Sequence, residues 1–303
     1  MKTPSRRTFL ASTLGAAALS VTPARASAQQ EPGESPQLAN PKRPLEGSKT
    51  QFSLNIEMWL RDLPFTDRIR AAADLGFRWV EFWPWRGKDL PAIKQVCAET
   101  EVQVSQFTGW GFVPGMNNPV NHEAFEKEIL ASCKVAQDLG APMMTVVAGN
   151  DQPGMTSEQM HEHIITGLKR VAPIAEAHQV MLILEPMNIR VDHKGHSLYG
   201  SPDAVRICRE VNSPMVKINW DLYHMQISEG DLCGRMKEGF DQIGYLQLAD
   251  HPGRHEPGTG EIHYNRVLKE AWNLGYRGPV GVECSPSAPA LESATRLALA
   301  DIW

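Results

Sequence analysis

The chain has 303 residues, of which 42% are hydrophobic and 21% charged, a composition typical of a soluble globular protein. Its 30 Lys and Arg residues against 35 Asp and Glu residues give a formal net charge of −5. This balance excludes an overall basic field that would hold a nucleic-acid backbone, so we expect no nucleic-acid partner.

Residues 1–28 combine positive charge with a weakly apolar run. Arg6 and Arg7 stand before this run, which extends over residues 10–21, and small residues lead up to Ala28. The arrangement resembles a bacterial twin-arginine export signal. The resemblance implies a signal peptide that is recognised by the twin-arginine export machinery and cleaved after Ala28, and a mature protein in the periplasm. An ordinary amphipathic first helix is the alternative.

Residues 29–50 are rich in Pro, Gly, Ser, Glu and Gln. Such a segment buries too little apolar surface to offset the entropy of ordering, so we expect a flexible linker. No later apolar run reaches the roughly 18 residues that span a bilayer, and we expect no stable membrane insertion. The five cysteines show no paired spacing, which argues against a disulfide framework.

From residue 51 to residue 303, short β-rich runs alternate with longer segments of helical periodicity. We expect strands at residues 52–58, 79–83, 103–109, 143–149, 181–186, 216–221, 243–250 and 279–284. We expect helices at residues 65–75, 89–100, 122–139, 157–178, 202–211, 229–240, 264–274 and 290–300. Eight such units in about 250 residues predict an α/β fold of the (β/α)8 TIM-barrel type. A doubly wound sheet would normally show a glycine-rich turn after its first strand, and none is found.

Acidic residues stand where three of the expected strands end. Glu185, Asp221 and Glu283 each finish a hydrophobic run, and active sites of TIM barrels lie at the carboxyl ends of the strands. Three carboxylates that meet at one barrel mouth would repel one another and raise each other's pKa. A divalent cation such as Mg²⁺ or Mn²⁺ would relieve this repulsion. Ion pairs with Lys or Arg across the barrel top are the alternative.

Two stretches, residues 218–226 and 248–262, resemble the signature sequences of the hydroxypyruvate isomerase family, which belongs to the xylose isomerase-like TIM barrels. The resemblance extends from about residue 52 to about residue 286. It implies one divalent metal ion, Mn²⁺ or Mg²⁺, whose ligands are Glu185, Asp221, Gln247 and Glu283. The amide of Gln247 stands where related epimerases have a histidine.

The family resemblance also implies a mechanism. Glu185 and Glu283 would serve as catalytic acid and base, and would move a proton between adjacent carbons of a small hydroxy-carbonyl compound or sugar through an enediolate. His224 matches a family histidine that contacts the substrate oxygen, where it would donate a hydrogen bond to the developing negative charge.

Further substrate-binding candidates are Arg254, Glu256 and Trp110. Glu256 has an equally good alternative as a residue that orders its loop. Trp110 is one of four tryptophans near early strand ends, which form either a packing layer at the rim or a wall that stacks on sugar rings; the others are Trp59, Trp83 and Trp85.

The chain departs from the family pattern after Glu283, where Cys284 and Ser285 replace an aromatic and a basic residue, and in the loop over residues 188–199. Without that basic residue, a substrate carboxylate lacks a charge-assisted donor. We therefore expect a neutral ketose or aldose to fit better than hydroxypyruvate, unless one of three cations moves into the site: Arg190, Lys194 or Arg254.

Three other functions stay open or are disfavoured. A ketose 3-epimerase or a lyase that acts on a larger sugar or an oxidised glycoside would use the same residues. A non-catalytic periplasmic sugar-binding barrel would be favoured by the loss of a metal ligand, and none is lost. A nuclease of the endonuclease IV kind is disfavoured by the acidic charge and by too few histidines. The sequence leaves a homo-oligomer open.

Overall fold

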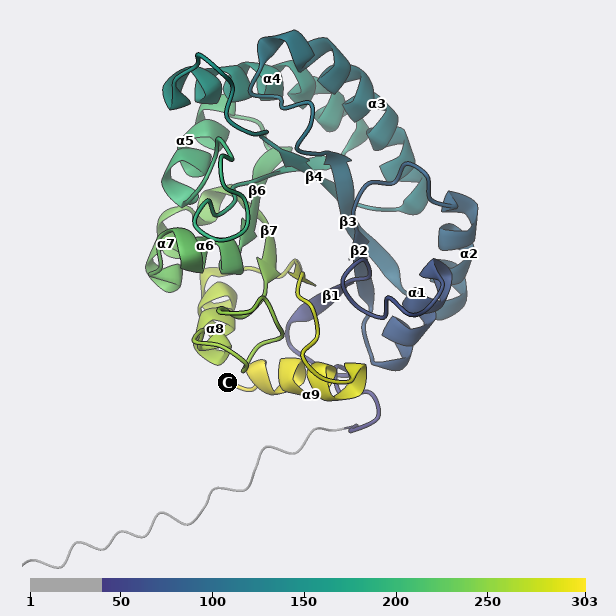
Figure 1. The fold of residues 1–303 in the computed structure, drawn as a ribbon. Coiled ribbons are helices and arrows are strands. Elements are labelled where there is room, and N and C mark those ends of the chain that lie inside the picture. Colours follow the sequence, from purple (N-terminus) through teal and green to yellow (C-terminus); the bar gives the residue numbers. More distant parts are fainter. Residues whose placement is uncertain (1–39) are drawn as a thin grey trace, which may run out of the picture. The chain divides into compact units, whose positions relative to one another are not determined.

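Eight parallel strands close into a barrel in the order of the chain, as expected for a TIM barrel (Figure 1). The computed structural model describes residues 40–303; the expected signal peptide and the first part of the linker lie outside the described residues. The first and last strands pair directly, with Phe52 beside Val280, which completes the ring. The strands are β1 (Gln51–Asn55), β2 (Trp79–Phe82), β3 (Gln103–Trp110), β4 (Met143–Val147), β5 (Met181–Glu185), β6 (Val216–Asp221), β7 (Ile243–Leu248) and β8 (Pro279–Val282).

Helices surround the barrel on its outer side (Figure 1). They are α1 (Phe65–Asp74), α2 (Leu90–Thr100), α3 (His122–Leu139), α4 (Ser157–His178), α5 (Ser201–Val211), α6 (Leu222–Ser228), α7 (Leu232–Glu238), α8 (Tyr264–Leu274) and α9 (Ala290–Ala300), with short 3-10 turns η1 (Pro119–Asn121) and η2 (Phe240–Gln242). Seven of the expected helices match within two residues at either end. A capping box at Thr156 and Gln159 fixes the start of α4, and Gly140 in the left-handed region ends α3.

The region after β6 differs from the expectation of one helix over residues 229–240. An additional helix, α6, begins directly after the strand, because the carboxylate of Asp221 accepts a hydrogen bond from the backbone N–H of Tyr223 (2.8 Å) and so caps it. Gly230 and Asp231 both have positive φ, and they separate α6 from the shorter α7. His224 therefore lies on this additional helix, three residues past Asp221.

Alternation along the strands directs polar side chains into the barrel interior. On β1, Phe52 and Leu54 are buried in the main hydrophobic core, whereas the hydroxyl of Ser53 meets that of Ser105 on β3 across the barrel (2.7 Å). Tyr245 on β7 reaches across to Glu81 on β2 (2.7 Å). The barrel therefore holds a hydrogen-bonded polar layer beneath its mouth.

The last part of the expected linker is attached to the barrel. Leu45 is buried in the core. The backbone N–H groups of Lys49 and Thr50 both donate to the carboxylate of Asp301, at 2.6 and 3.0 Å. Residues 40–50 therefore belong to the folded unit. Their backbone N–H groups bond to Asp301 in place of water, and Leu45 adds buried apolar surface.

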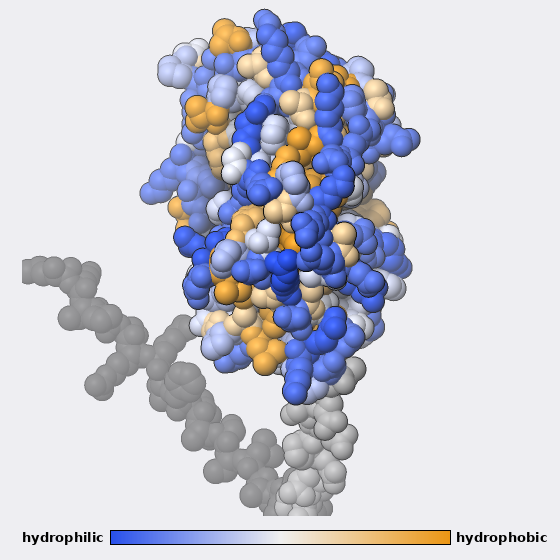
Figure 2. All heavy atoms as spheres, turned by 90° about the vertical axis from the view of Figure 1, so that its right-hand side faces the viewer, coloured by the Kyte–Doolittle hydropathy of each residue, from blue (hydrophilic) through white to orange (hydrophobic). Residues whose placement is uncertain are grey.

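The outer surface over α1, α2 and α3 is mainly hydrophilic, with hydrophobic residues in small groups between the charged ones (Figure 2). Ion pairs connect these neighbouring helices: Arg70 with Glu99 at 2.7 Å and Lys94 with Asp138 at 2.5 Å. Such exposed pairs contribute little stability, about 0–1 kcal/mol each. Within residues 40–303, no helix has the length and apolar character needed to cross a bilayer. All five cysteines are free thiols.

Candidate active site

Four side chains expected to be functional meet at the carboxyl ends of the strands. Glu185 is the last residue of β5, Asp221 is the last residue of β6, and Glu283 follows β8 directly. With His224 on α6, they offer four candidate ligand atoms that all lie within 4.8 Å of one another. Each of the four residues is buried.

Burial and like charge shape the electrostatics of this cluster. Burial raises the pKa of Asp221 to about 7, against an opposing effect of the Arg254 guanidinium. Burial, with the negative charges of Glu283 and Asp221, raises the pKa of Glu185 well above its usual range. Burial and the nearby Arg254 charge lower the pKa of His224, which favours a neutral imidazole. Burial and like charge thus disfavour ionisation of these carboxyls, and an added cation would stabilise their ionised form.

Several polar atoms in the cluster have no protein partner, although buried polar atoms are usually hydrogen-bonded. Oδ2 of Asp221 and Nε2 of His224 are buried without a hydrogen bond. Oε1 of Glu185 lies 3.9 Å from His224 Nε2, too far for a hydrogen bond. Unsatisfied carboxylate oxygens that converge on one point are a donor set suited to a hard divalent cation.

Gln247, the fourth expected ligand, lies on β7 between the two strands that position Asp221 and Glu283. It pairs in register with Asp221 on one side and with Gly281 of β8 on the other. Its Nε2 donates to Glu81 (2.9 Å), and its Oε1 accepts from Asn219 (2.6 Å). The amide therefore lines the same pocket, while its oxygen is engaged with a neighbouring side chain.

Arg254 supplies the positive charge of the site. Its Nη2 lies 2.5 Å from Oε2 of Glu283 and 3.8 Å from Oδ2 of Asp221, and its guanidinium packs over the ring of Tyr223. Glu283 thus forms the ion pair with a basic residue that was considered as the alternative to metal binding. Arg254 also lines the pocket, so the same guanidinium is placed to meet a substrate.

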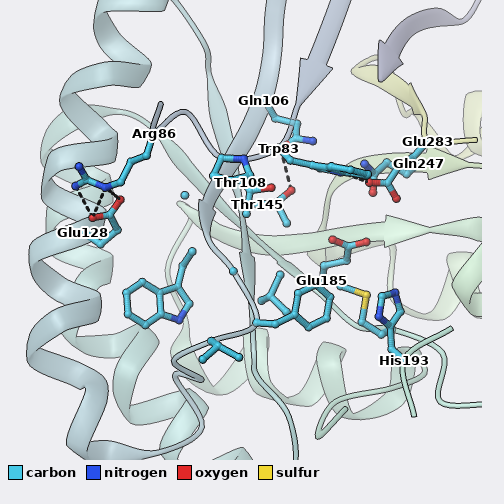
Figure 3. Close-up of a pocket in the computed structure, with 18 of the residues that line it drawn as sticks. Trp83, Arg86, Gln106, Thr108, Glu128, Thr145, Glu185, His193, Gln247 and Glu283 are labelled. Atoms are coloured by element: carbon cyan, nitrogen blue, oxygen red, sulfur yellow. Dashed lines mark hydrogen bonds and ion pairs between the residues drawn. The ribbon is translucent and has the colours of Figure 1, made fainter. Parts of the chain in front are cut away.

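The cluster forms one end of a cavity of about 830 Å³. Figure 3 shows Glu185, Gln247 and Glu283 at this end and the Arg86–Glu128 ion pair at the other, with Trp83 between them. The walls of the cavity are largely apolar and include Met58, Trp83, Trp110, Phe112 and Val113.

The four tryptophans divide between packing and pocket. Trp83 and Trp110 line the cavity, and Nε1 of Trp83 donates to Oε1 of Glu283 (3.0 Å). Trp59 is fully buried in the core, and Trp85 donates to Ser132 on α3 (2.8 Å). Trp59 and Trp85 therefore fit the packing alternative, and the sugar-stacking alternative stays a prediction for Trp83 and Trp110.

Glu256 does not line the cavity. Its carboxylate is fully buried and accepts hydrogen bonds from the backbone N–H and the hydroxyl of Ser287, both at 2.8 Å, and from Arg296 at 2.8 Å. These contacts tie the loop after β7 to the segment that leads into α9. They favour the loop-ordering alternative for Glu256 over a substrate contact.

Two residues that the sequence analysis missed complete the site. Glu81, inside β2, lies beneath the cluster and binds Gln247; strand alternation would have shown that it faces inward. Asn188, fully buried just after β5, donates through Nδ2 to Nδ1 of His224 (2.7 Å). No spacing signal connects Asn188 with His224, because the contact depends on how the loop after β5 folds against α6.

Comparison with known proteins identifies related sequences and folds. A family model described as "Xylose isomerase-like TIM barrel" matches residues 69–300. The hydroxypyruvate isomerase of Escherichia coli is 33% identical over 78% of this chain and 93% of its own length. The 2-oxo-tetronate isomerase of Cupriavidus necator is 32% identical over 78% of this chain and 94% of its own length.

Solved structures show the same architecture. A Brucella melitensis protein described as an AP endonuclease of family 2 superposes with a TM-score of 0.76 at 25% identity, over 80% of this chain and 96% of that one. The 3-keto-D-glucoside 4-epimerase of E. coli superposes with a TM-score of 0.70 at 21% identity, over 83% of this chain and 98% of that one.

Proposed function

Because this chain belongs to the hydroxypyruvate isomerase family of xylose isomerase-like TIM barrels, and is an isomerase-type enzyme, we propose that it is metal-dependent and moves a proton between adjacent carbons of a small hydroxy-carbonyl compound or sugar. One observation carries the proposal. Two glutamates, Glu185 and Glu283, share a buried cluster with an unpartnered oxygen of Asp221.

The residues present fit a divalent cation, Mn²⁺ or Mg²⁺. Glu185, Asp221 and Glu283 would hold it through carboxylate oxygens, and Gln247 through its amide oxygen once that oxygen leaves Asn219. When bound, the cation supplies Lewis-acid polarisation of the substrate carbonyl.

The side chains themselves perform the proton transfer. One of Glu185 and Glu283 removes the proton from the hydroxyl-bearing carbon beside the carbonyl, which leaves an enediolate. The proton of that hydroxyl passes to the former carbonyl oxygen, and the protonated glutamate or its partner delivers a proton to the former carbonyl carbon. Nε2 of His224, unpartnered and aimed into the cluster, donates a hydrogen bond to the oxygen that gains negative charge.

The test is proton exchange in D₂O. Protein loaded with Mn²⁺ or Mg²⁺ is incubated with hydroxypyruvate, with 2-oxo-tetronate and with neutral ketoses, and deuterium incorporation and product are followed by NMR and mass spectrometry. We expect deuterium at the carbon next to the carbonyl for at least one substrate, lost on chelation and in Glu185→Gln and Glu283→Gln. Exchange that persists in both variants contradicts the assigned roles.

A second candidate, an epimerase or lyase that acts on a larger neutral sugar or an oxidised glycoside, is favoured by the size of the cavity. A volume of about 830 Å³ falls in the upper part of the roughly 300–1,000 Å³ that small-molecule sites span, and a three-carbon acid would fill little of it. Trp83 and Trp110 contribute indole rings to the cavity wall, and we propose that they stack on the sugar.

Charge gives only partial support to the expected preference for neutral sugars. Arg190 and Lys194 do not line the main cavity. Arg254 does line it, but its guanidinium already forms an ion pair with the carboxylate of Glu283. Comparing kcat/KM for hydroxypyruvate, neutral ketoses and glycosides decides between the candidates. A value that rises with substrate length supports the larger sugar, and a maximum at hydroxypyruvate contradicts it.

We also propose that the protein is exported to the periplasm by the twin-arginine machinery. The proposal rests on Arg6 and Arg7 before the apolar run. Fractionation of cells that express the wild type and an Arg6→Lys, Arg7→Lys variant tests it. Wild-type protein that stays in the cytoplasm with its first 28 residues intact contradicts the proposal.

A further inference from the structure

Asn188 connects the loop after β5 to the imidazole of His224. Its side-chain Nδ2 lies 2.7 Å from Nδ1 of His224 and 2.7 Å from Oδ2 of Asp192. Its side-chain Oδ1 accepts hydrogen bonds from the backbone N–H groups of Val191 (3.0 Å) and Asp192 (3.1 Å). Both N–H groups and both acceptor positions of this amide therefore have partners within the protein.

These partners allow only one orientation of the amide. Two backbone N–H groups are donors and require the oxygen, while the carboxylate of Asp192 is an acceptor and requires the NH₂ group. The opposite orientation would place the NH₂ group against two donors and the oxygen against a carboxylate. The group that faces Nδ1 of His224 is consequently an N–H donor.

The direction of this hydrogen bond fixes the histidine. Nδ1 must accept, so it carries a lone pair, and the single proton of the neutral ring lies on Nε2. Nε2 is the atom that points into the acidic cluster, 3.5 Å from Oδ2 of Asp221 and 3.9 Å from Oε1 of Glu185.

We propose that Asn188, held by the turn over residues 188–192, is a positioning residue that fixes His224 as the Nε2–H tautomer and thereby makes it a hydrogen-bond donor to substrate rather than a metal ligand. The inference deepens the proposed function and rests on it for the identity of the reaction. It has a geometric consequence of its own. Nε2 belongs to the four atoms that lie close enough together to bind a cation, yet a protonated Nε2 has no lone pair to give.

The direct test is NMR of the full-length protein labelled with ¹⁵N-histidine, metal-free and with Mg²⁺. Two-bond couplings between the ring nitrogens and the ring C–H protons distinguish the two tautomers, and a His224→Gln variant assigns the signal. We expect Nε2–H for His224 in both states. A spectrum with Nδ1–H, or loss of the Nε2 proton on addition of Mg²⁺, overturns the inference.

Asn188→Asp inverts the hydrogen bond, because a carboxylate can only accept and would draw the proton to Nδ1. Repulsion between the new carboxylate and Asp192 can disturb the loop, so the matched variant is Asn188→Asp with Asp192→Asn, which restores a donor opposite the carboxylate and keeps the tautomer inverted. We expect Nδ1–H in both variants, a thermal midpoint in the double variant close to wild type, and a kcat about 100-fold lower at nearly unchanged KM.

The two readouts separate failure of this inference from failure of the proposed function. The NMR result needs no substrate, so an Nε2–H spectrum with no turnover of any sugar contradicts the function and supports the tautomer assignment. A double variant that keeps full kcat with an inverted tautomer overturns the role assigned to Asn188.

Discussion

Two buried glutamates in the same barrel have opposite surroundings. Glu81, in the middle of β2, accepts hydrogen bonds from four side chains: Asn55 (3.1 Å), Gln106 (3.1 Å), Tyr245 (2.7 Å) and Gln247 (2.9 Å). Glu185, at the end of β5, faces Asp221, Glu283 and a histidine nitrogen that is too far away to bond.

The difference separates a structural carboxylate from one prepared for a ligand. Each carboxylate oxygen of Glu81 accepts two hydrogen bonds, which offset part of the cost of its burial, while burial and the negative charge of Glu283 still raise its pKa to about 7. Glu185 lacks this compensation, and its neighbours add negative charge. A native fold retains such an arrangement where a bound group completes it, which is why we assign the chemistry to Glu185 and the support of the polar layer to Glu81.

The largest expected effect contrasts Glu185→Gln with Glu81→Gln, the same conservative change in the same barrel. Glu185→Gln removes an acid–base group and should lower kcat by about 10²–10⁴-fold, with a thermal midpoint equal to or above that of wild type because like-charge repulsion falls. Steady-state kinetics and thermal unfolding measure both. A fully active Glu185→Gln variant contradicts the comparison.

Metal binding should stabilise the protein more at pH 8 than at pH 5. The pKa of Asp221 is raised from 3.8 to about 7 by burial, so the native carboxyl stays protonated while the unfolded one ionises. This contribution to stability is complete below about pH 4 and is lost as the pH rises through 7, at ~1.4 kcal/mol per pH unit for each such group.

A cation reverses that loss, because it binds the ionised ligands. At a concentration 100 times its Kd it adds about 2.7 kcal/mol. Thermal unfolding with Mn²⁺, with Mg²⁺ and with a chelator at both pH values checks this. Equal thermal midpoints with and without metal at pH 8 would contradict metal binding. They would support the alternative in which the ion pair between Arg254 and Glu283 alone balances the charge of the cluster.

Glu81→Gln should act mainly on stability. The new amide would turn an N–H group toward at least one of the four donors, which costs about 1–3 kcal/mol. We expect a lower thermal midpoint and an unchanged metal content of one ion per chain by elemental analysis. A Glu81→Gln variant that loses the metal while staying folded would place Glu81 in the ligand set instead.

The smallest effect is expected for Trp83→Phe. This variant tests Glu283, whose carboxylate has more hydrogen-bond partners than that of Glu185 and fewer than that of Glu81. Glu283 has both a salt bridge to Arg254 and the indole N–H of Trp83. Phenylalanine keeps a ring on the cavity wall and loses the hydrogen bond, so we expect a change in kcat/KM worth about 0.5–1.5 kcal/mol. Trp83→Ala is the control for the ring. Equal effects of the two variants would assign the contribution to the hydrogen bond alone.

Sequence patterns predicted the features that depend on local order. Hydrophobic runs with a terminal acid placed Glu185 and Asp221 at strand ends, and the alternation of strand and helix gave the eight-unit barrel. Glu81 was missed because it stands in the middle of a strand rather than at its end, although its alternation with Val80 and Phe82 indicates that it faces the barrel interior. Helix α6 was missed because its start depends on one side-chain cap at Asp221.

Tertiary contacts explain the remaining differences. The ion pair between Arg254 and Glu283 joins two loops that are 29 residues apart in the chain, and the contact of Asn188 with His224 joins residues 36 apart. Periodicity carries no information about such pairs, since each depends on how a loop folds over the barrel mouth.

The attachment of residues 40–50 to the end of the chain has a consequence for engineering. The hydroxyl of Thr50 donates to Asp301 at 2.5 Å, and the ammonium of Lys49 donates to the backbone carbonyl of Trp303 and lies over its indole ring. Residues 49 and 50, directly before β1, therefore lie beside residues 301–303. A short peptide could join them, and new termini could be opened in a surface loop far from the barrel mouth. In such a circular permutant each strand keeps its partners and the cyclic order around the ring, and only the strand at which synthesis begins changes.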